Sequence, residues 1–228
     1  YTFIISKVMR IIYPDIKFIY RSHSIEYEIR KKNSNKLIAV LTKLLEKNIF
    51  NSNDYCTSVS KLEAHKIKKL YGVKPYIFPN AVSLNRLKII SKNSIERKMP
   101  KQFILFSGSY MYKPNKGAID ILIDKIMPAL TKDLPKLKLV LTGGGVTHRA
   151  KWLINLGIIS KEKLIKYILK SNCVVVPIYE GYGTRIKIIE ALMLGKIVIS
   201  SKKGIEGIEY NKNKKPPFVV NNINDFIK

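Results

Sequence analysis

The sequence predicts an α/β protein built on parallel β-sheets, and three observations support that fold class. First, β-prone and helical segments alternate along the 228 residues. Second, short uninterrupted apolar runs such as residues 173–176 are typical of strands that are covered on both faces, as in a parallel sheet. Third, several of these runs end at glycine or proline and are followed by a helical pattern, which predicts right-handed strand–helix–strand units.

The first part of the chain opens with an apolar run at residues 1–12 that resembles the tail of a helix. Helical spacing of apolar residues and β-prone composition predict the elements that follow. Strands are expected at residues 15–20, 55–59 and 74–78, and helices at residues 24–50 and 60–71. Ser60 precedes the second helix and is its expected N-cap.

Residues 83–101 show no clear periodicity and are the candidate linker. The pattern then restarts, with strands expected at residues 103–106, 137–142, 173–177, 196–200 and 218–220, and helices at residues 115–130, 161–169 and 185–194. This arrangement predicts two Rossmann-like domains that join near residue 95. Residues 1–95 are the remainder of an N-terminal domain with the linker, and residues 96–228 form a C-terminal domain. Both ends of the chain look cut, so the N-terminal domain is expected to be incomplete.

The formal net charge of +26 is the most prominent compositional feature. It is compatible with nucleic-acid binding, with docking on an anionic lipid surface, or with a lysine-rich solvated surface. No recognised nucleic-acid motif accompanies the charge, so a nucleic-acid partner is not expected. No run approaches the ~20 apolar residues of a membrane span. Cys56 and Cys173 lie in or beside apolar runs and are expected to be buried thiols in a reducing cytosol.

Residues 177–184 have the composition of a ligand-binding turn. A buried strand ends at Pro177, and a helix is expected to begin near Thr184. Gly181 and Gly183 allow the backbone to approach an anion closely. In open α/β sheets, ligands bind beyond the carboxyl ends of strands, and a helix N-terminus attracts a diphosphate.

Charged residues in the following helix point to the same chemistry. Arg185 and Lys187 place positive charge in its first turn, where the helix dipole disfavours cations unless an anion is bound. Glu190 lies one to two turns further on and can accept hydrogen bonds from ribose or sugar hydroxyls. The alternative is an ordinary surface turn with incidental charge.

Residues 181–196, together with the glycine loop at residues 204–208, resemble the donor-site signature of family 4-type glycosyltransferases of the GT-B fold, also called glycosyl transferases group 1. Other segments are similar to the same family. Residues 106–115 and 139–145 resemble the start of its donor domain, and residues 21–26, 58–60 and 78–82 resemble parts of its acceptor domain.

The resemblance implies a retaining transfer of a sugar from a nucleotide diphosphate to an acceptor. Glu190 would hold the ribose, and His23 would lie near the donor sugar. The diphosphate would be held by Gly183, Thr184, Arg185 and Lys187, with Gly108 at the opening of the donor domain. Neutralisation of the leaving diphosphate by these groups needs no metal, and the sequence has no Asp-x-Asp motif. No cofactor is expected, because the nucleotide-sugar is a substrate.

The chain departs from the family pattern at three places. Tyr182 stands where many members have a glutamate that contacts the donor sugar, and Glu180, two residues away, is the candidate catalytic substitute. Ser109 stands where many members have an arginine, and Lys116 is the candidate for part of that charge. The first strand and glycine-rich loop of the family precede Tyr1, so the fragment itself is expected to be of doubtful activity.

Three functions remain open at this point. The first is a glycosyltransferase in the cytoplasm, or peripheral on the inner face of the cell membrane, that builds a polysaccharide or a lipid-linked glycan. The second is a non-catalytic, degenerate module that binds polyanions on the same fold. The third is a sugar-nucleotide epimerase, which would need acid/base carboxylates for which Glu26 and Glu180 are weak candidates.

Overall fold

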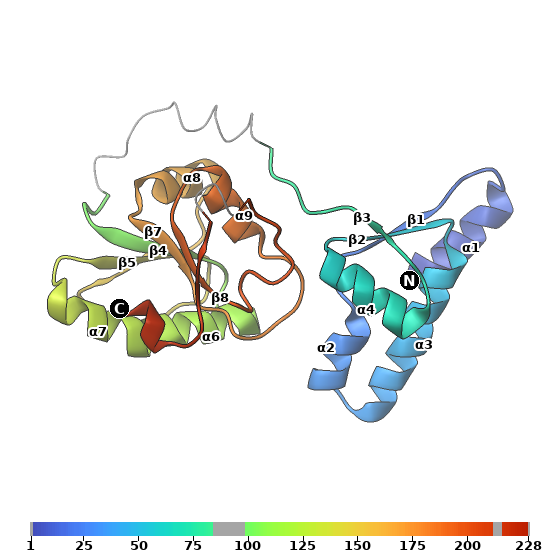
Figure 1. Cartoon of the computed structure of the whole chain (residues 1–228), viewed down its shortest axis with the longest axis horizontal. Coiled ribbons are helices and arrows are strands. Elements are labelled where there is room, and N and C mark those ends of the chain that lie inside the picture. The colour runs from blue at the N-terminus through green and yellow to red at the C-terminus, as the bar shows by residue number, and fades with distance from the viewer. Residues whose placement is uncertain (1, 84–98, 212–215, 228) are drawn as a thin grey trace. The chain divides into compact units, whose positions relative to one another are not determined.

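The computed structural model describes residues 2–83, 99–211 and 216–227 (Figure 1). The chain divides into two compact units. The first comprises residues 1–80 with residues 182–184, and the second comprises residues 81–181 and 185–228. The domain boundary expected near residue 95, and most of the candidate linker at residues 83–101, fall in residues 84–98, outside the described residues. That boundary stays a prediction.

The first unit contains a parallel three-stranded sheet of order β1-β2-β3. Its strands are β1 (Ile19–Ser22), β2 (Tyr55–Ser58) and β3 (Tyr76–Ile77), and its helices are α1 (Thr2–Ile12), α2 (Glu26–Asn33), α3 (Lys36–Ser52) and α4 (Lys61–Tyr71). Its core forms around Phe50, which stacks on Tyr71 with ring centroids 5.1 Å apart and meets the edge of Tyr20 at 5.2 Å. The strands are shorter than the sequence predicts, and the strand expected at residues 15–20 is displaced, because β1 begins only at Ile19 and ends at Ser22.

The prediction of one helix at residues 24–50 is wrong, because the chain forms two helices there. Ser34 adopts an extended conformation and ends α2. Asn35 then caps α3, its side-chain oxygen accepting a hydrogen bond from the Ile38 N–H at 2.9 Å. Asparagine and serine compete with the helix by bonding to nearby backbone, which explains the break. The same chemistry confirms the predicted cap of α4, where Ser60 Oγ accepts from the Glu63 N–H.

A buried carboxylate fixes the start of α2. Glu46 of α3 is 3% exposed and accepts hydrogen bonds from the Glu26 and Tyr27 N–H groups at 2.7 and 2.9 Å. The Tyr71 hydroxyl donates a further hydrogen bond to the same carboxylate at 2.5 Å. Because free N–H groups at a helix start favour a negative charge, Glu46 anchors the segment that follows β1.

The second unit contains a parallel six-stranded sheet of order β6-β5-β4-β7-β8-β9. Its strands are β4 (Phe103–Ser107), β5 (Lys138–Thr142), β6 (Leu153–Asn155), β7 (Cys173–Val176), β8 (Val198–Ser201) and β9 (Phe218–Val220). The helical elements are α6 (Lys113–Ile121), the π-helix η1 (Leu122–Ile126), α7 (Met127–Asp133), α8 (Lys161–Lys170), α9 (Ile186–Met193) and the 3₁₀ turn η2 (Asn224–Phe226).

This strand order confirms the predicted Rossmann-like fold of the second unit. Read in chain order from β4, it is 3-2-1-4-5-6, the arrangement of doubly wound α/β sheets. Helices α6 and α7 lie on one side of the sheet and α8 and α9 on the other (Figure 1). The central strands are therefore covered on both faces, and Phe103, Leu105 and Phe106 of β4 are fully buried.

The helix predicted at residues 115–130 forms as a continuous helical segment with a π-helical section in its middle. Pro128 explains the irregularity, because proline has no N–H to donate to the carbonyl group four residues earlier. The Met127 N–H bonds instead to the Leu122 carbonyl, five residues back. Strand β6 was not predicted, because a strand of three residues is too short to show a two-residue alternation of apolar and polar side chains.

Candidate functional site

The strand order of the second unit reverses between β4 and β7, which are hydrogen-bonded neighbours. In open α/β sheets, ligands bind in the crevice at the carboxyl ends of two such strands. Gly108 follows β4 directly, and the loop at residues 177–185 follows β7. The predicted donor-binding residues of the second unit are therefore placed at, or beside, the position that the topology favours.

Lys187 lies at the centre of this crevice. It is the second residue of α9, and its Nζ donates a hydrogen bond to Asn115 Oδ1 at 2.8 Å. The ammonium also lies 4.2 Å from the ring centroid of Phe106, at the end of β4. The Asn115 amide in turn donates to the Ser109 carbonyl at 3.1 Å, so side chains from α6 and β4 hold the lysine in place.

Gly108 makes room for this arrangement. A Cβ atom at Gly108 would lie 2.6 Å from Asn115 Nδ2 and 2.7 Å from Lys187 Nζ, closer than non-bonded atoms approach. Its φ of 154° is also rare for residues with a side chain. The structure thus brings together Gly108 and Lys187, which are predicted site residues 79 positions apart in sequence.

The turn after β5 packs against the same position. The Gly108 N–H bonds to the Thr142 carbonyl at 2.8 Å, and the Gly143 N–H bonds to the Gly157 carbonyl at 2.7 Å. A Cβ at Gly143, whose φ is 115°, would overlap the Gly108 carbonyl group. The turns that follow β4, β5 and β6 therefore contact one another through backbone.

Burial and charge act together on Lys187. Removal from water, and secondarily the positive charge of Arg185, lower the pKa of Lys187 from 10.5 to about 7. Its ammonium contacts an amide oxygen and an aromatic ring and, among the described residues, no carboxylate. A bound anion would supply the missing counter-charge.

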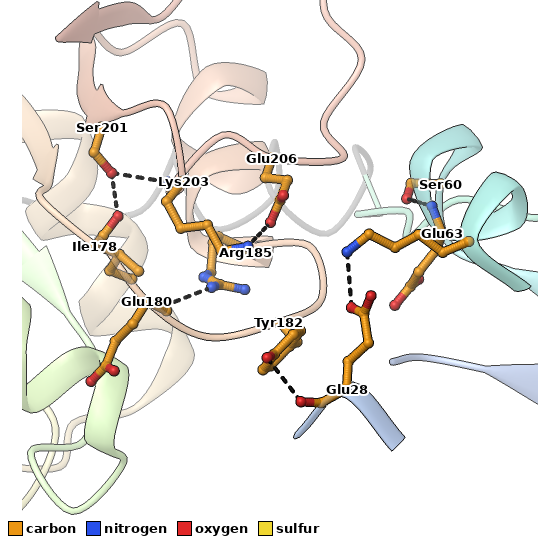
Figure 2. Close-up of polar contacts among 12 residues, drawn as sticks. Glu28, Ser60, Glu63, Ile178, Glu180, Tyr182, Arg185, Ser201, Lys203 and Glu206 are labelled. Carbon is orange, nitrogen blue, oxygen red and sulfur yellow. Dashed lines mark hydrogen bonds and ion pairs between the residues drawn. The ribbon is translucent and has the colours of Figure 1, made fainter. Parts of the chain in front are cut away.

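Arg185 occupies the N-cap position of α9, which begins at Ile186, two residues later than the start expected near Thr184. Its Nη2 donates to the Glu180 carbonyl at 3.2 Å, across the loop that follows β7 (Figure 2). The residue is 8% exposed, and burial lowers the pKa of its guanidinium. Tyr112 and Glu206 oppose that effect.

The loop after β8 is tied to the end of β7 by two buried hydroxyl groups. Ser200 Oγ donates to the Val176 carbonyl at 3.0 Å. Ser201 Oγ donates to the Ile178 carbonyl (Figure 2). The Gly204 N–H donates to Ser201 Oγ at 3.0 Å, which fixes the glycine loop beside the site. These contacts hold the loop after β8 against the end of β7.

Glu190, the predicted ribose acceptor, is 8% exposed on the second turn of α9. Its Oε1 forms an ion pair with Nζ of Lys161, the first residue of α8. The carboxylate is therefore held in place by a cation that lies on a different helix.

The remaining predicted residues lie outside this cluster or beside it. Lys116 pairs with Asp120 at 2.9 Å and lies 5.0 Å from the Tyr110 ring, an arrangement that raises the pKa of the lysine. The Glu180 carboxylate lies 3.9 Å from the Lys113 ammonium at the surface. The roles predicted for Lys116 and Glu180 stay predictions.

Three further predicted residues are placed by chain position. Gly183, with a φ of 75°, and Thr184 lie in the loop between β7 and α9. His23 is exposed and directly follows β1 in the first unit. Its predicted position near a donor sugar concerns both units and stays a prediction.

The cluster of Lys187, Arg185 and a helix N-terminus at the carboxyl edge has the chemistry of an anion site. Within residues 2–83, 99–211 and 216–227, no group of three or more His, Cys, Asp or Glu side chains could hold a metal ion. Both cysteines are free, with Cys56 buried and Cys173 partly buried. In the same part of the chain, no helix is long and apolar enough to cross a membrane.

Two contributors to the site were not predicted in their observed roles. Asn115 is the hydrogen-bond partner of Lys187, and Lys161 is the ion-pair partner of Glu190. The Pro114–Asn115 pair at a helix start was a readable signal for the first. No sequence signal marks the second, because the partners are 29 residues apart on different helices.

Comparison with known proteins assigns the second unit to the family that its sequence resembles. A family model described as glycosyl transferases group 1 matches residues 101–228. No curated protein sequence matches the chain.

Solved structures resemble the chain along most of its length. Sucrose-phosphate synthase from Thermosynechococcus elongatus has a TM-score of 0.69 at 17% identity, over 99% of this chain and 60% of that one. HepE from Anabaena, in complex with UDP and glucose, has a TM-score of 0.69 at 16% identity, over 97% and 62%. WaaG, a glycosyltransferase involved in lipopolysaccharide biosynthesis, has a TM-score of 0.66 at 13% identity, over 92% and 63%. The chain thus spans about three fifths of these structures and shares the fold of two Rossmann-like domains.

Proposed function

Because the chain belongs to the group 1 glycosyltransferases, we propose that it binds a nucleotide-diphosphate sugar and transfers the sugar, with retention of configuration, to a polysaccharide or lipid-linked acceptor. The second unit supplies the donor site, at the carboxyl ends of β4 and β7. Solved relatives of the same fold hold UDP, or UDP and glucose, in their structures.

The observation that carries this proposal is the half-buried ammonium of Lys187 beside the Arg185 guanidinium. Two neighbouring cations at a helix N-terminus repel each other in the free protein, and Lys187 is partly discharged there at neutral pH. A diphosphate would remove that repulsion and gain two charge-assisted contacts in a site shielded from water. The same groups would stabilise the charge that develops on the leaving diphosphate without a metal ion.

The other site residues have roles consistent with this placement. Glu190 accepts hydrogen bonds from the ribose hydroxyls, and Gly183 and Thr184 present backbone and hydroxyl groups to the phosphates. Glu180 and His23 are the proposed contacts to the transferred sugar. Lys116 adds positive charge near the phosphate end once it leaves Asp120.

Titration calorimetry with UDP-, GDP- and ADP-sugars, with and without EDTA, tests the donor site. We expect one nucleotide class to bind at micromolar concentration, with the same affinity in EDTA, and the binding to be lost in Lys187→Ala and Glu190→Ala. Lys170→Met, which removes an exposed lysine at the end of α8, is the charge-matched control and should bind normally. Unchanged binding in Lys187→Ala would contradict the assignment.

We further propose that the enzyme works as a peripheral protein on the inner face of the cell membrane. The net charge of +26 favours anionic lipid. Helices α1 and α3 carry exposed apolar side chains, namely Ile4, Ile5, Val8, Ile11, Ile12, Leu37, Val40, Leu41, Leu44 and Leu45. Cosedimentation with vesicles of phosphatidylglycerol, but not of phosphatidylcholine, is the expected result. Equal recovery from both would remove the electrostatic argument.

The net charge also favours a second candidate, a non-catalytic module that binds polyanions. Such binding would fall steeply with ionic strength, because it depends on the release of counterions. It would also show no preference for a nucleotide-sugar over heparin or polyphosphate. A competition series at two salt concentrations therefore distinguishes the two functions.

A further inference from the structure

Lys161 lies at the donor site but is not part of the diphosphate cluster. Its Nζ forms an ion pair with Glu190 Oε1. The carboxylate side chain is 11% exposed and the lysine side chain 38%, so the ammonium approaches a shielded acid from the solvent side. Lys161 is therefore accessible to a ligand that would also reach Glu190.

The position of Lys161 is fixed by the start of α8. Ser160 caps the helix, its Oγ accepting from the Lys163 N–H at 3.2 Å. The preceding segment is held to the sheet, because the Leu156 N–H bonds to the Leu141 carbonyl at 2.9 Å. The buried Ile165 of α8 packs against Leu194, which directly follows α9. These contacts hold the lysine and the carboxylate in a constant relation within the second unit.

Helix geometry separates this pair from the phosphate-binding cations. Glu190 lies three residues after Lys187 on α9, which corresponds to ~4.5 Å along the helix axis. That displacement is of the size expected between a phosphate and the sugar ring next to it. Lys161 thus lies at the nucleoside end of the proposed donor site, while Lys187 and Arg185 lie at the phosphate end.

The ion pair leaves acceptor capacity on the carboxylate. An ionised carboxylate has about four lone-pair sites, and the lysine takes up a position at only one of the two oxygen atoms. The ion pair with Lys161 fixes the rotamer of Glu190, which favours acceptance of hydrogen bonds from a pair of vicinal hydroxyl groups.

We propose that Lys161 is a positioning residue for the nucleoside end of the donor: it holds the Glu190 carboxylate in the orientation that accepts the ribose hydroxyls. The inference rests on the proposed function, since it assigns a role within the same donor site. A positioning role for the Lys161–Glu190 ion pair differs from a purely structural one because it affects ligand binding. A surface pair contributes little to stability and nothing to the recognition of one ligand over another.

Calorimetric titration with two probes tests the assignment. Nucleoside diphosphates (UDP, GDP and ADP) fill both ends of the site, whereas inorganic pyrophosphate fills only the phosphate end. Lys161→Met should weaken binding of the preferred nucleoside diphosphate about tenfold, the effect of losing one charge-assisted contact. Pyrophosphate affinity should stay within about twofold of the wild type.

Two further variants sharpen the test. Lys161→Arg keeps the cation and should restore nucleoside diphosphate affinity to within about threefold of the wild type. Lys170→Met removes a lysine from the other end of α8 and should change neither affinity. In steady-state assays of transfer, Lys161→Met should raise KM for the donor and leave kcat unchanged. Circular dichroism at rising temperature verifies that each variant is folded.

The inference fails if folded Lys161→Met binds the nucleoside diphosphate as tightly as the wild type. It also fails if pyrophosphate and nucleoside diphosphate lose affinity equally, because the lysine would then act only as general positive charge. A wild-type protein that binds pyrophosphate but no nucleoside diphosphate would overturn the proposed function and this inference together. Loss of the Lys161 effect alone leaves the proposed function standing.

Discussion

Replacing Lys187 by methionine should make the second unit more stable at neutral pH while it removes the anion site. Methionine keeps the unbranched chain beside the Phe106 ring but carries no charge. The native lysine lowers the free energy of unfolding, because its ammonium is partly withdrawn from water next to Arg185 with no counter-charge. Gain of stability with loss of binding is the signature of a residue retained for function.

The magnitude follows from the pKa of Lys187, which falls from 10.5 to about 7 on folding. Between these two pH values the unfolded chain holds a proton that the folded chain has released. The free energy of unfolding of the wild type therefore rises with pH, by at most about 1.4 kcal/mol per pH unit. Below pH 7 both states are protonated and the full penalty is present. Because water screens a partly exposed ammonium, we expect the variant to gain about 2 kcal/mol at pH 6–7.

The single tryptophan of the chain provides the assay. Trp152 is partly buried and packs against the core of the second unit, so its fluorescence reports the unfolding of that unit. Urea titrations of wild type and Lys187→Met at pH 6, 7, 8 and 9 give the difference in free energy of unfolding at each pH. Lys170→Met, at an exposed position, should show a difference near zero at every pH.

The expected difference is largest at pH 6–7 and shrinks as the pH approaches 9. If it is constant over this range, or if Lys187→Met is the less stable protein at pH 6, then the ammonium is not destabilised by burial. Either result would also refute the electrostatic argument that an anion binds beside Lys187.

Three other substitutions or modifications test separate features. Gly108→Ala would place a methyl group against Asn115 and Lys187, so we expect it to lose about 2 kcal/mol in the Trp152 assay and to bind pyrophosphate more weakly; wild-type behaviour would show that the crevice is wider than described. Ser60→Ala removes the cap of α4 and should lower thermal stability by about 1 kcal/mol, with Ser60→Asp restoring it. Burial raises the pKa of Cys173 to about 11, so its thiol should react with iodoacetamide at pH 8 far more slowly in the native protein than in urea. Equal rates in the two states would contradict that burial.

Most of the fold of the second unit could be predicted from the sequence, for a physical reason. Strands such as β7, which are buried on both faces, are continuous apolar runs, and turns after them need glycine or proline. The short strand β6 lacks that signal. The division between α2 and α3 was not predicted, because it depends on the side chain of Asn35. Asparagine can lie inside a helix or cap its start, and here Asn35 caps α3 by accepting a hydrogen bond from the Ile38 N–H.

The candidate site was predictable only in part. Arg185, Lys187 and Glu190 lie within six residues on one helix start, so their proximity follows from the sequence. The approach of Gly108 to Lys187 depends on the pairing of β4 with β7. Only the family resemblance predicted that these two residues belong to one site. The partner of Glu190 could not be anticipated, because long-range ion pairs follow from the packing of α8 and not from any local pattern.

The backbone contact between Gly108 and Gly143 restricts how this protein can change over evolutionary time. A side chain at Gly143 would displace the turn at Gly108, so a replacement at Gly143 is not independent of the conformation of that turn. A lineage that substitutes Gly143 must first reshape the turn at Gly108. Among descendants of this sequence, we expect Gly143 to be replaced only where the turn at Gly108 has also changed, even though the two glycines lie on different loops.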